Sequence, residues 1–366
     1  MTDSHAGAAM PQPVQLNDLG WNAALARTFA QVAAPDDVAA RVTAVHKNRV
    51  VVAGAFGERS AASDRHSQEL AIEQRPATGD WIVLHLDPQD GSARVRAVLP
   101  RQSVFLRRAV GAKSVAQVVA ANVDHVFIVT SLPHDFNPRR LERYVAAAWE
   151  SGAMPTIVLT KSDLVDDSAD WIARARTGAP GVDVLAISTL TGDGIADVET
   201  LMSPGMTVAL LGSSGVGKST LINHLAGRNT MRTADVRDDG RGRHTTTHRE
   251  LIRLPSGVLV IDTPGMRELQ LWAGHAGLDQ AFEDIATFSE QCRFGDCTHV
   301  GEPDCAVRAA LETGALLPER IASWRKLQRE AMRANRDAVE TAEQQAKLRN
   351  FMRAARQHTR DKYRGQ

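Results

Sequence analysis

The stretch Gly212-Ser-Ser-Gly-Val-Gly-Lys-Ser219 matches the phosphate-loop pattern G-x-x-x-x-G-K-[ST]. An apolar strand is predicted over residues 207–211, and a helix from about Lys218. In this setting the loop N–H groups and the positive end of the helix face a phosphate. We therefore expect nucleotide binding rather than a structural glycine turn. The predicted contacts are Gly212, Ser213, Ser214, Gly215, Val216, Gly217, Lys218, Ser219 and Thr220.

Two more motifs are expected at the phosphate end of this site. Asp262-Thr-Pro-Gly265 follows an apolar strand and resembles D-x-x-G, whose aspartate positions magnesium and whose glycine N–H senses the γ-phosphate. The alternative for this motif is a simple loop. Gly242-Arg-His-Thr-Thr-Thr247 resembles a first switch, in which Thr246 would ligate magnesium when the γ-phosphate is present; Thr245 is the alternative.

The chemistry at the γ-phosphate is divided among several of these residues. Lys218 would reach the β- and γ-phosphates, and the Ser219 hydroxyl would ligate magnesium. Met266 stands where Ras-like enzymes carry the glutamine that orients water, so another group must supply that function. His244 is the best internal candidate, although it could simply pack the loop. The predicted catalytic residues are His244, Lys218 and Thr246, and the predicted magnesium site comprises Ser219, Thr246 and Asp262.

A base-recognition motif is predicted from Thr160-Lys-Ser-Asp163, which resembles N/T-K-x-D. Asp163 would accept two hydrogen bonds from guanine that adenine cannot donate, and Lys161 would pack along the base. Thr160 stands where many sequences have asparagine; its hydroxyl can still tether the phosphate loop. Ser188 opens a segment that resembles the S-A-x motif. The predicted base-site residues are Thr160, Lys161, Ser162, Asp163 and Ser188; a plain helix cap is the alternative.

The order of these motifs is inverted. Asp163 lies 49 residues before Gly212, whereas in Ras-like GTPases the base motif follows the phosphate loop. A nucleotide pocket requires only that its loops meet in space. The order therefore predicts a circularly permuted GTPase that uses Mg²⁺ with GTP.

The three cysteines of the chain lie close together, in Cys292-x₄-Cys297-x-His299-x₅-Cys305. Three thiolates and one imidazole suit a closed tetrahedral zinc site without an open position for chemistry. The alternative is a set of reduced core cysteines with an unrelated histidine. We predict one structural Zn²⁺, held by Cys292, Cys297, His299 and Cys305.

Composition limits the classes of protein that fit. With 43% hydrophobic and 23% charged residues among 366, the chain is typical of globular proteins. No apolar run is long enough for a membrane span and no signal peptide is evident, so a cytoplasmic location is expected. The net charge is zero, but 13 Lys and Arg against 5 Asp and Glu follow from Arg320 onward, which favours a polyanionic partner.

Patterning along the chain predicts a multidomain protein. We expect a flexible leader over residues 1–35 and a β-barrel over 36–110, with an OB-fold favoured over an SH3-like barrel. Strands alternate with helices over 115–275, which predicts a parallel α/β sheet for the permuted GTPase domain. Residues 276–366 should form a mostly helical zinc-binding domain with a basic tail.

The combination resembles the small-ribosomal-subunit-dependent circularly permuted GTPases (ribosome biogenesis GTPase A). Besides the permuted motifs, the resemblance rests on Gly79-Asp-Trp81, Asn122-Val-Asp124, Gly242-Arg-His-Thr-Thr-Thr247 and Cys297-Thr-His299. It covers about residues 36–310.

This resemblance implies a monomeric GTPase whose turnover is stimulated by the 30S subunit during late small-subunit maturation. GTP would favour binding to 16S rRNA through the barrel and the zinc domain, and hydrolysis to GDP would favour release. Arg101, Arg107 and Arg108 are candidate phosphate contacts, with solvated arginines as the alternative. The competing classes are a small-molecule phosphotransferase and a nucleotide-gated adaptor of another pathway.

Overall fold

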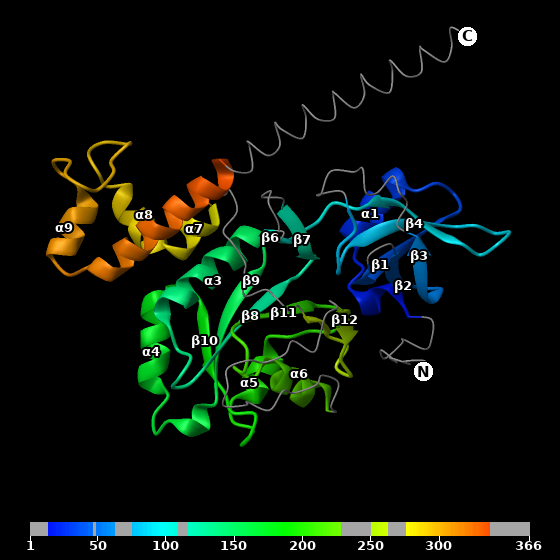
Figure 1. Ribbon diagram of the computed structural model, residues 1–366, viewed down its shortest axis with the longest axis horizontal. Helices are drawn as coiled ribbons and strands as arrows, with labels where there is room; N and C mark the ends of the chain where they lie inside the picture. The colour runs from blue at the N-terminus through cyan, green and yellow to red at the C-terminus, as the bar shows by residue number, and fades with distance from the viewer. Residues whose placement is uncertain are drawn as a thin grey trace, which may run out of the picture.

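The computed structural model of the chain describes residues 14–46, 49–62, 75–108, 116–227, 250–262 and 276–336 (Figure 1). A barrel, a central sheet with helices on both faces and a helical C-terminal region follow one another along the chain. None of the helices in these ranges has both the length and the apolar character required to cross a membrane.

The segment ahead of the barrel is folded from residue 14 onward, so the expectation of a flexible leader is wrong for residues 14–35. It contains a 3₁₀ helix, η1 (Leu16–Leu19), and a helix, α1 (Ala23–Val32). The Asn22 side chain accepts hydrogen bonds from two N–H groups at the start of α1, as a good helix cap does. Leu19 is fully buried, so this segment contributes to the core.

Five strands close into a barrel: β1 (Asp37–Val45), β2 (Arg49–Gly54), β3 (Gly57–Ala62), β4 (Trp81–Leu86) and β5 (Ala93–Val98). Their order is β1-β2-β3-β5-β4, and pairing of β4 with β1 closes the ring. Only β3 and β5 are parallel neighbours. The predicted OB-fold is confirmed. The sequence pattern missed β3, because Ala61 is its only buried residue.

A hairpin of β6 (Val104–Arg108) and β7 (Ala116–Ala121) leads from the barrel to the central sheet. That sheet contains β8 (His125–Ser131), β9 (Met154–Thr160), β10 (Asp183–Ala186), β11 (Thr207–Leu211), β12 (Glu250–Arg253) and β13 (Leu259–Asp262). The order is β10-β9-β8-β11-β13-β12, and only β12 runs antiparallel. The strand that enters the phosphate loop, β11, therefore lies inside the sheet.

Helices cover both faces of this sheet, as the alternating pattern predicts. They are α3 (Pro138–Ser151), α4 (Ala169–Gly178), α5 (Ile195–Thr200) and α6 (Lys218–Ala226). Alternate residues of β8 enter two different cores: Val126 and Ile128 join the core that contains α3, whereas Phe127 and Val129 join the one that contains α5 and α6. The carboxyl ends of the parallel strands are thus left for a ligand.

The C-terminal region is helical, as predicted, and lies against α3 (Figure 1). It contains α7 (Ala276–Ala281), α8 (Glu283–Ser289), α9 (Ala306–Glu312) and a long helix over residues 318–336. The Gly277 N–H donates to Glu150 on α3 at 3.1 Å. A Cβ atom at Gly277 would lie 2.4 Å from the Glu150 backbone nitrogen, so the close contact of α7 with α3 requires glycine there.

Candidate nucleotide site and metal centre

The phosphate loop connects β11 to α6 and depends on its glycines. Gly212 has a φ of +146°, and a Cβ atom there would lie 2.1 Å from the Val129 carbonyl oxygen of β8. Gly217, with a φ of +99°, is the N-cap residue immediately before α6. The Lys218 ammonium donates to the carbonyl oxygens of Gly212 and Ser213, at 2.8 and 2.5 Å. Lys218 is therefore directed back across its own loop, where phosphates would lie.

The base motif is attached directly to this loop. The Thr160 hydroxyl, at the end of β9, donates to the Val216 carbonyl at 2.6 Å. The Lys161 ammonium donates to the Gly215 carbonyl at 3.1 Å. Segments that are inverted in sequence order therefore meet in one place. The expected tether between Thr160 and the phosphate loop is present in the structure.

Asp163 is oriented by a side chain rather than by the backbone. The Ser188 hydroxyl, which follows β10, donates to the Asp163 carboxylate at 2.5 Å. This hydroxyl in turn accepts the N–H groups of Leu190 and Thr191, each at 3.2 Å. The Ser188 N–H donates to the Asp193 carbonyl at 3.0 Å. The resemblance to S-A-x predicted Ser188 at the base site but not this contact of its hydroxyl with Asp163.

Several predicted residues at the γ-phosphate end lie outside the described residues. They are His244, Thr245, Thr246, Gly265 and Met266, together with the side chain of Asp262. The backbone of Asp262 ends β13, whose Ile261 pairs with Ala209 on β11. Ser219 and Thr220 lie in the first turn of α6, and Ser162 donates its N–H to the Ile187 carbonyl at 3.1 Å.

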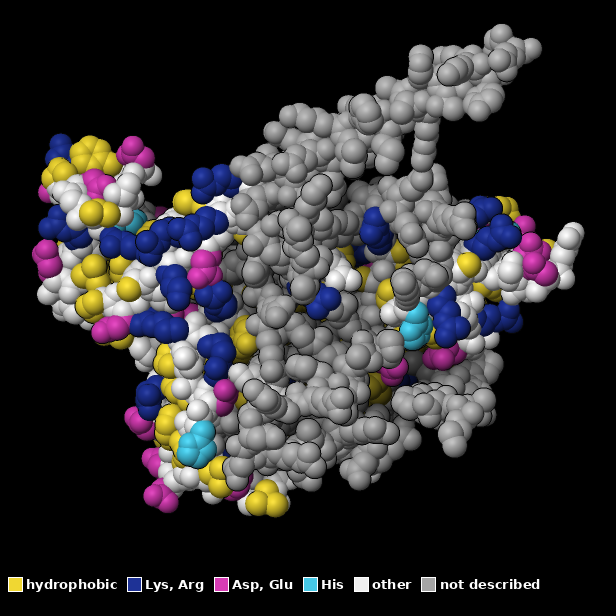
Figure 2. Space-filling view, viewed as in Figure 1, with side chains coloured by type: hydrophobic (Ala, Val, Ile, Leu, Met, Phe, Trp, Pro, Cys, Tyr) yellow, Lys and Arg dark blue, Asp and Glu magenta, His cyan; other side chains and the backbone are white. Residues whose placement is uncertain are grey.

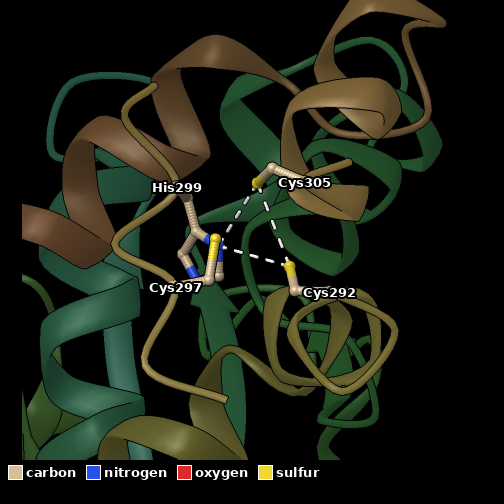
Figure 3. A group of neighbouring side chains, drawn as sticks. All are labelled: Cys292, Cys297, His299 and Cys305. Atoms are coloured by element: carbon tan, nitrogen blue, oxygen red, sulfur yellow. Dashed lines mark hydrogen bonds between the residues drawn. The ribbon is translucent and has the colours of Figure 1, made fainter. Parts of the chain in front are cut away.

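The four predicted metal ligands converge in the C-terminal region (Figure 3). The ligand atoms of Cys292, Cys297, His299 and Cys305 all lie within 4.8 Å of one another. His299 Nδ1 lies 3.6 Å from the Cys292 sulfur and 3.5 Å from the Cys305 sulfur, and those sulfurs are 3.9 Å apart. A tetrahedral zinc ion would require about 3.8 Å between sulfurs and about 3.6 Å between nitrogen and sulfur. The group can hold a metal ion.

The surroundings of the cluster suit metal binding as well. The other ring nitrogen of His299 lies 3.2 Å from the Ser289 hydroxyl, which leaves Nδ1 for a metal. Burial lowers the pKa of His299, which favours the neutral imidazole. Desolvation opposes ionisation of Cys292, but hydrogen bonds from the Val307 and Ala306 N–H groups help to give a net lowering of its thiol pKa. Desolvation raises the pKa of Cys297 to about 11, so this thiol would lose its proton on binding the metal. Neutral imidazole and thiolate are the forms that ligate metals.

One predicted RNA contact has a structural role instead. Arg101 forms two hydrogen bonds of 2.7 Å with Asp80, and both side chains are largely buried. The expectation that Arg101 contacts phosphate is therefore wrong, because its guanidinium compensates a buried carboxylate. Arg107 donates to Gln117 across the exposed β6–β7 hairpin. The side chain of Arg108 lies outside the described residues.

Comparison with known proteins places this geometry in a family. The RsgA GTPase family matches residues 98–272. The small ribosomal subunit biogenesis GTPase RsgA of Opitutus terrae is 48% identical over 333 residues, which cover 88% of this chain and 91% of that protein.

Two solved structures share the fold. The YjeQ structure from Thermotoga maritima has a TM-score of 0.59 and 24% identity, over 81% of this chain and 99% of that one. YloQ, a circularly permuted GTPase, has a TM-score of 0.58 and 22% identity, over 81% of this chain and 95% of that one. The permuted motif order, the barrel ahead of the nucleotide-binding sheet and the similarity over nearly the whole chain agree: the chain belongs to the RsgA family of small ribosomal subunit biogenesis GTPases.

Proposed function

We propose that the protein hydrolyses GTP late in 30S subunit maturation, and that it binds the subunit with GTP and leaves it after hydrolysis. The observation that carries this proposal is the direct attachment of the base motif to the phosphate loop, through Thr160 to Val216 and Lys161 to Gly215. The relatives are named small ribosomal subunit biogenesis GTPases, which supports a role in 30S subunit maturation. We also propose that the small subunit stimulates hydrolysis and that the protein contacts 16S rRNA. The proposal further includes a cytoplasmic location and a monomeric state.

In this proposal each end of the site recognises one part of GTP. Asp163, held by Ser188, accepts the guanine N–H groups. The phosphate-loop N–H groups and Lys218 bind the phosphates, and Ser219 ligates Mg²⁺. Thr246 and Asp262 complete the magnesium site, and Gly265 contacts the γ-phosphate. Mg²⁺ supplies neutralisation of the charge that develops on the phosphates.

His244 is our proposed residue for orienting the attacking water. It adjoins the switch threonines in sequence, and Met266 cannot perform this function. His244→Ala should abolish subunit-stimulated turnover while the affinity for GTP persists. Unchanged stimulated turnover in this variant would refute the assignment.

Zinc is our proposed occupant of the cysteine and histidine cluster, with a structural role. The separations among Cys292, His299 and Cys305 match those of a tetrahedral zinc site, and with Cys297 the protein offers four ligands. Cys297→Ser should release one equivalent of zinc, measured by elemental analysis, and should unfold the region after residue 276. A variant that stays folded without metal would contradict this role.

Turnover of GTP and ATP, each with and without purified 30S subunits, tests the proposal. We expect turnover of GTP, stimulation by the subunit, and no comparable response to free RNA. A preference for ATP would instead favour a phosphotransferase. Asp163→Asn should lose GTP affinity and gain affinity for xanthosine triphosphate, because the amide can donate to the additional base carbonyl. Equal affinities for guanine and adenine nucleotides in the parent protein would end the argument.

A further inference from the structure

The imidazole ring of His299 presents its two nitrogens to different neighbours. Nδ1 faces the sulfur atoms of Cys292 and Cys305, at 3.6 and 3.5 Å (Figure 3). Nε2 lies 3.2 Å from the hydroxyl oxygen of Ser289, the last residue of α8. His299 is 6% exposed, so an N–H group on this ring requires a hydrogen-bond partner. The nitrogen that carries the proton therefore decides which nitrogen is free to bind a metal.

The Ser289 hydroxyl can only accept a hydrogen bond from this ring. Its single proton is donated to the Ile285 carbonyl oxygen, one turn back along α8, at 2.8 Å. A hydroxyl has one donor and two acceptor lone pairs, so toward Nε2 the oxygen offers a lone pair. The separation of 3.2 Å is within the range of an N–H···O bond, with Nε2–H as the donor. A neutral imidazole has one N–H group, so Nδ1 keeps its lone pair on the side of the cysteine sulfurs.

The backbone of His299 is held from another direction, by the long helix over residues 318–336. Its φ is +61°, which is uncommon for a residue other than glycine. The His299 carbonyl oxygen accepts a hydrogen bond from the Arg325 guanidinium at 2.8 Å, and the centres of the His299 and Trp324 rings are 5.8 Å apart. The long helix thus fixes the place of the residue, and Ser289 fixes which ring nitrogen is protonated.

We propose that Ser289 is a positioning residue for the metal centre: by accepting a hydrogen bond from Nε2, its hydroxyl makes Nδ1 the metal-binding nitrogen of His299. A carboxylate acceptor in this place would add negative charge beside three thiolates, whereas the hydroxyl accepts the bond without charge. Without the hydroxyl, the ring can carry its proton on Nδ1 or rotate, and both alternatives compete with metal binding. The inference rests on the proposed zinc site and assigns Ser289 no part in GTP hydrolysis.

The test measures zinc affinity by competition with a chromophoric chelator, in the full-length protein loaded with zinc. Loss of such a hydrogen-bond partner typically weakens metal binding about 10–100-fold, and we expect at least the lower value for Ser289→Ala. The matched control is Thr313→Val, which also removes one hydroxyl at the end of a helix. The Thr313 hydroxyl donates to the Ala309 and Ala310 carbonyl oxygens of α9 rather than to a metal ligand. Its loss should leave zinc affinity close to that of the parent protein. Equal losses in the two variants, or no loss in Ser289→Ala, would overturn the inference.

Nitrogen NMR of the parent protein provides the second arm and requires no variant. With isotope-labelled histidine, the imidazole signals that appear only in the zinc-loaded protein should show the metal on Nδ1 and a proton on Nε2. A spectrum with the metal on Nε2 would overturn this inference and leave the zinc site intact. A parent protein that binds no zinc would overturn the zinc assignment and this inference together. Neither result bears on GTP turnover, which is measured separately with 30S subunits.

Discussion

Two buried arginines join outer parts of the molecule to the nucleotide-binding sheet, and they do so with different partners. Arg41 joins the barrel and donates to three carbonyl oxygens and one hydroxyl. Arg320 joins the C-terminal region to α3 and donates to two carboxylates, Glu142 and Asp284, besides two carbonyl oxygens. The barrel junction also contains paired backbone strands, whereas the C-terminal junction consists of helices in contact. Removing charge should therefore damage the second junction more, whereas both junctions contain a glycine, Gly79 or Gly277, that leaves no room for a side chain.

The largest expected effect is that of Arg320→Met. The change removes the guanidinium from the half-buried Asp284 and from the carbonyl oxygens of Gly178 and Ala281. It also leaves Glu142, which is 2% exposed, with Arg139 alone of its two guanidinium partners. Breaking a buried pair in this way costs about 3–5 kcal/mol of the free energy of unfolding. Urea unfolding measures it. Arg308→Met is the control, because its exposed pair with Glu312 should contribute less than about 1 kcal/mol. A similar cost for both variants would contradict the comparison.

Added volume tests the barrel junction. In Gly79→Ala the new Cβ atom would lie 2.1 Å from the Ala121 carbonyl oxygen, and the φ of +93° is strained for alanine. We expect about 1–3 kcal/mol from crowding and about 1 kcal/mol from the backbone conformation. Gly91→Ala isolates the second effect, because Gly91 has a φ of +68° with open space around it. Equal melting temperatures for the two variants would show that the barrel junction can relax to accommodate the added methyl group.

A smaller cost in stability is expected for Arg41→Met. Its partners are neutral oxygens, and an unsatisfied one costs about 1–3 kcal/mol when no water reaches it. Arg41 lines a cavity of about 340 Å³ between the N-terminal segment, the barrel and the start of β11, which can admit water to those oxygens. We therefore expect a smaller loss in urea unfolding than for Arg320→Met. A loss of unfolding free energy larger than that of Arg320→Met would contradict the expected order of the two variants.

The smallest effect concerns His125, the first residue of β8. Burial lowers the pKa of His125 below its ordinary value, and its Nε2 lies 2.8 Å from the Thr156 hydroxyl. The unfolded chain therefore binds a proton more readily, so stability present above about pH 6.5 is lost as the pH falls toward the folded-state pKa. Melting temperature should fall from about pH 7.5 to 5.5, and His125→Gln should reduce that slope. An unchanged slope would refute the assignment.

The parts that the sequence predicted are those with strong periodicity or a motif. The strand at residues 207–211 and the start of the helix at Lys218 were placed within one residue, because the strand is apolar and the loop between them carries a motif. The tether from Thr160 followed from the resemblance of Thr160-Lys-Ser-Asp163 to N/T-K-x-D together with the chemistry of a hydroxyl group. Strand β3 is mostly exposed and lacks an alternating pattern, and β12 has only four residues. The sequence therefore did not predict these two strands. The pairing of Arg101 with Asp80, or of Ser188 with Asp163, depends on contacts between distant segments that one sequence does not display.

The loop that carries two of the metal ligands is folded by its own hydrogen bonds. The Glu302 carboxylate accepts the N–H groups of Thr298, Val300 and Gly301 and the Thr298 hydroxyl, and these bonds hold the pKa of Glu302 well below its usual range. Because the loop between Cys297 and Cys305 is ordered in this way, capture of the ion requires little additional loss of chain entropy. Glu302 thereby lowers the loss of chain entropy that accompanies metal binding, while the ion itself keeps the surrounding region folded.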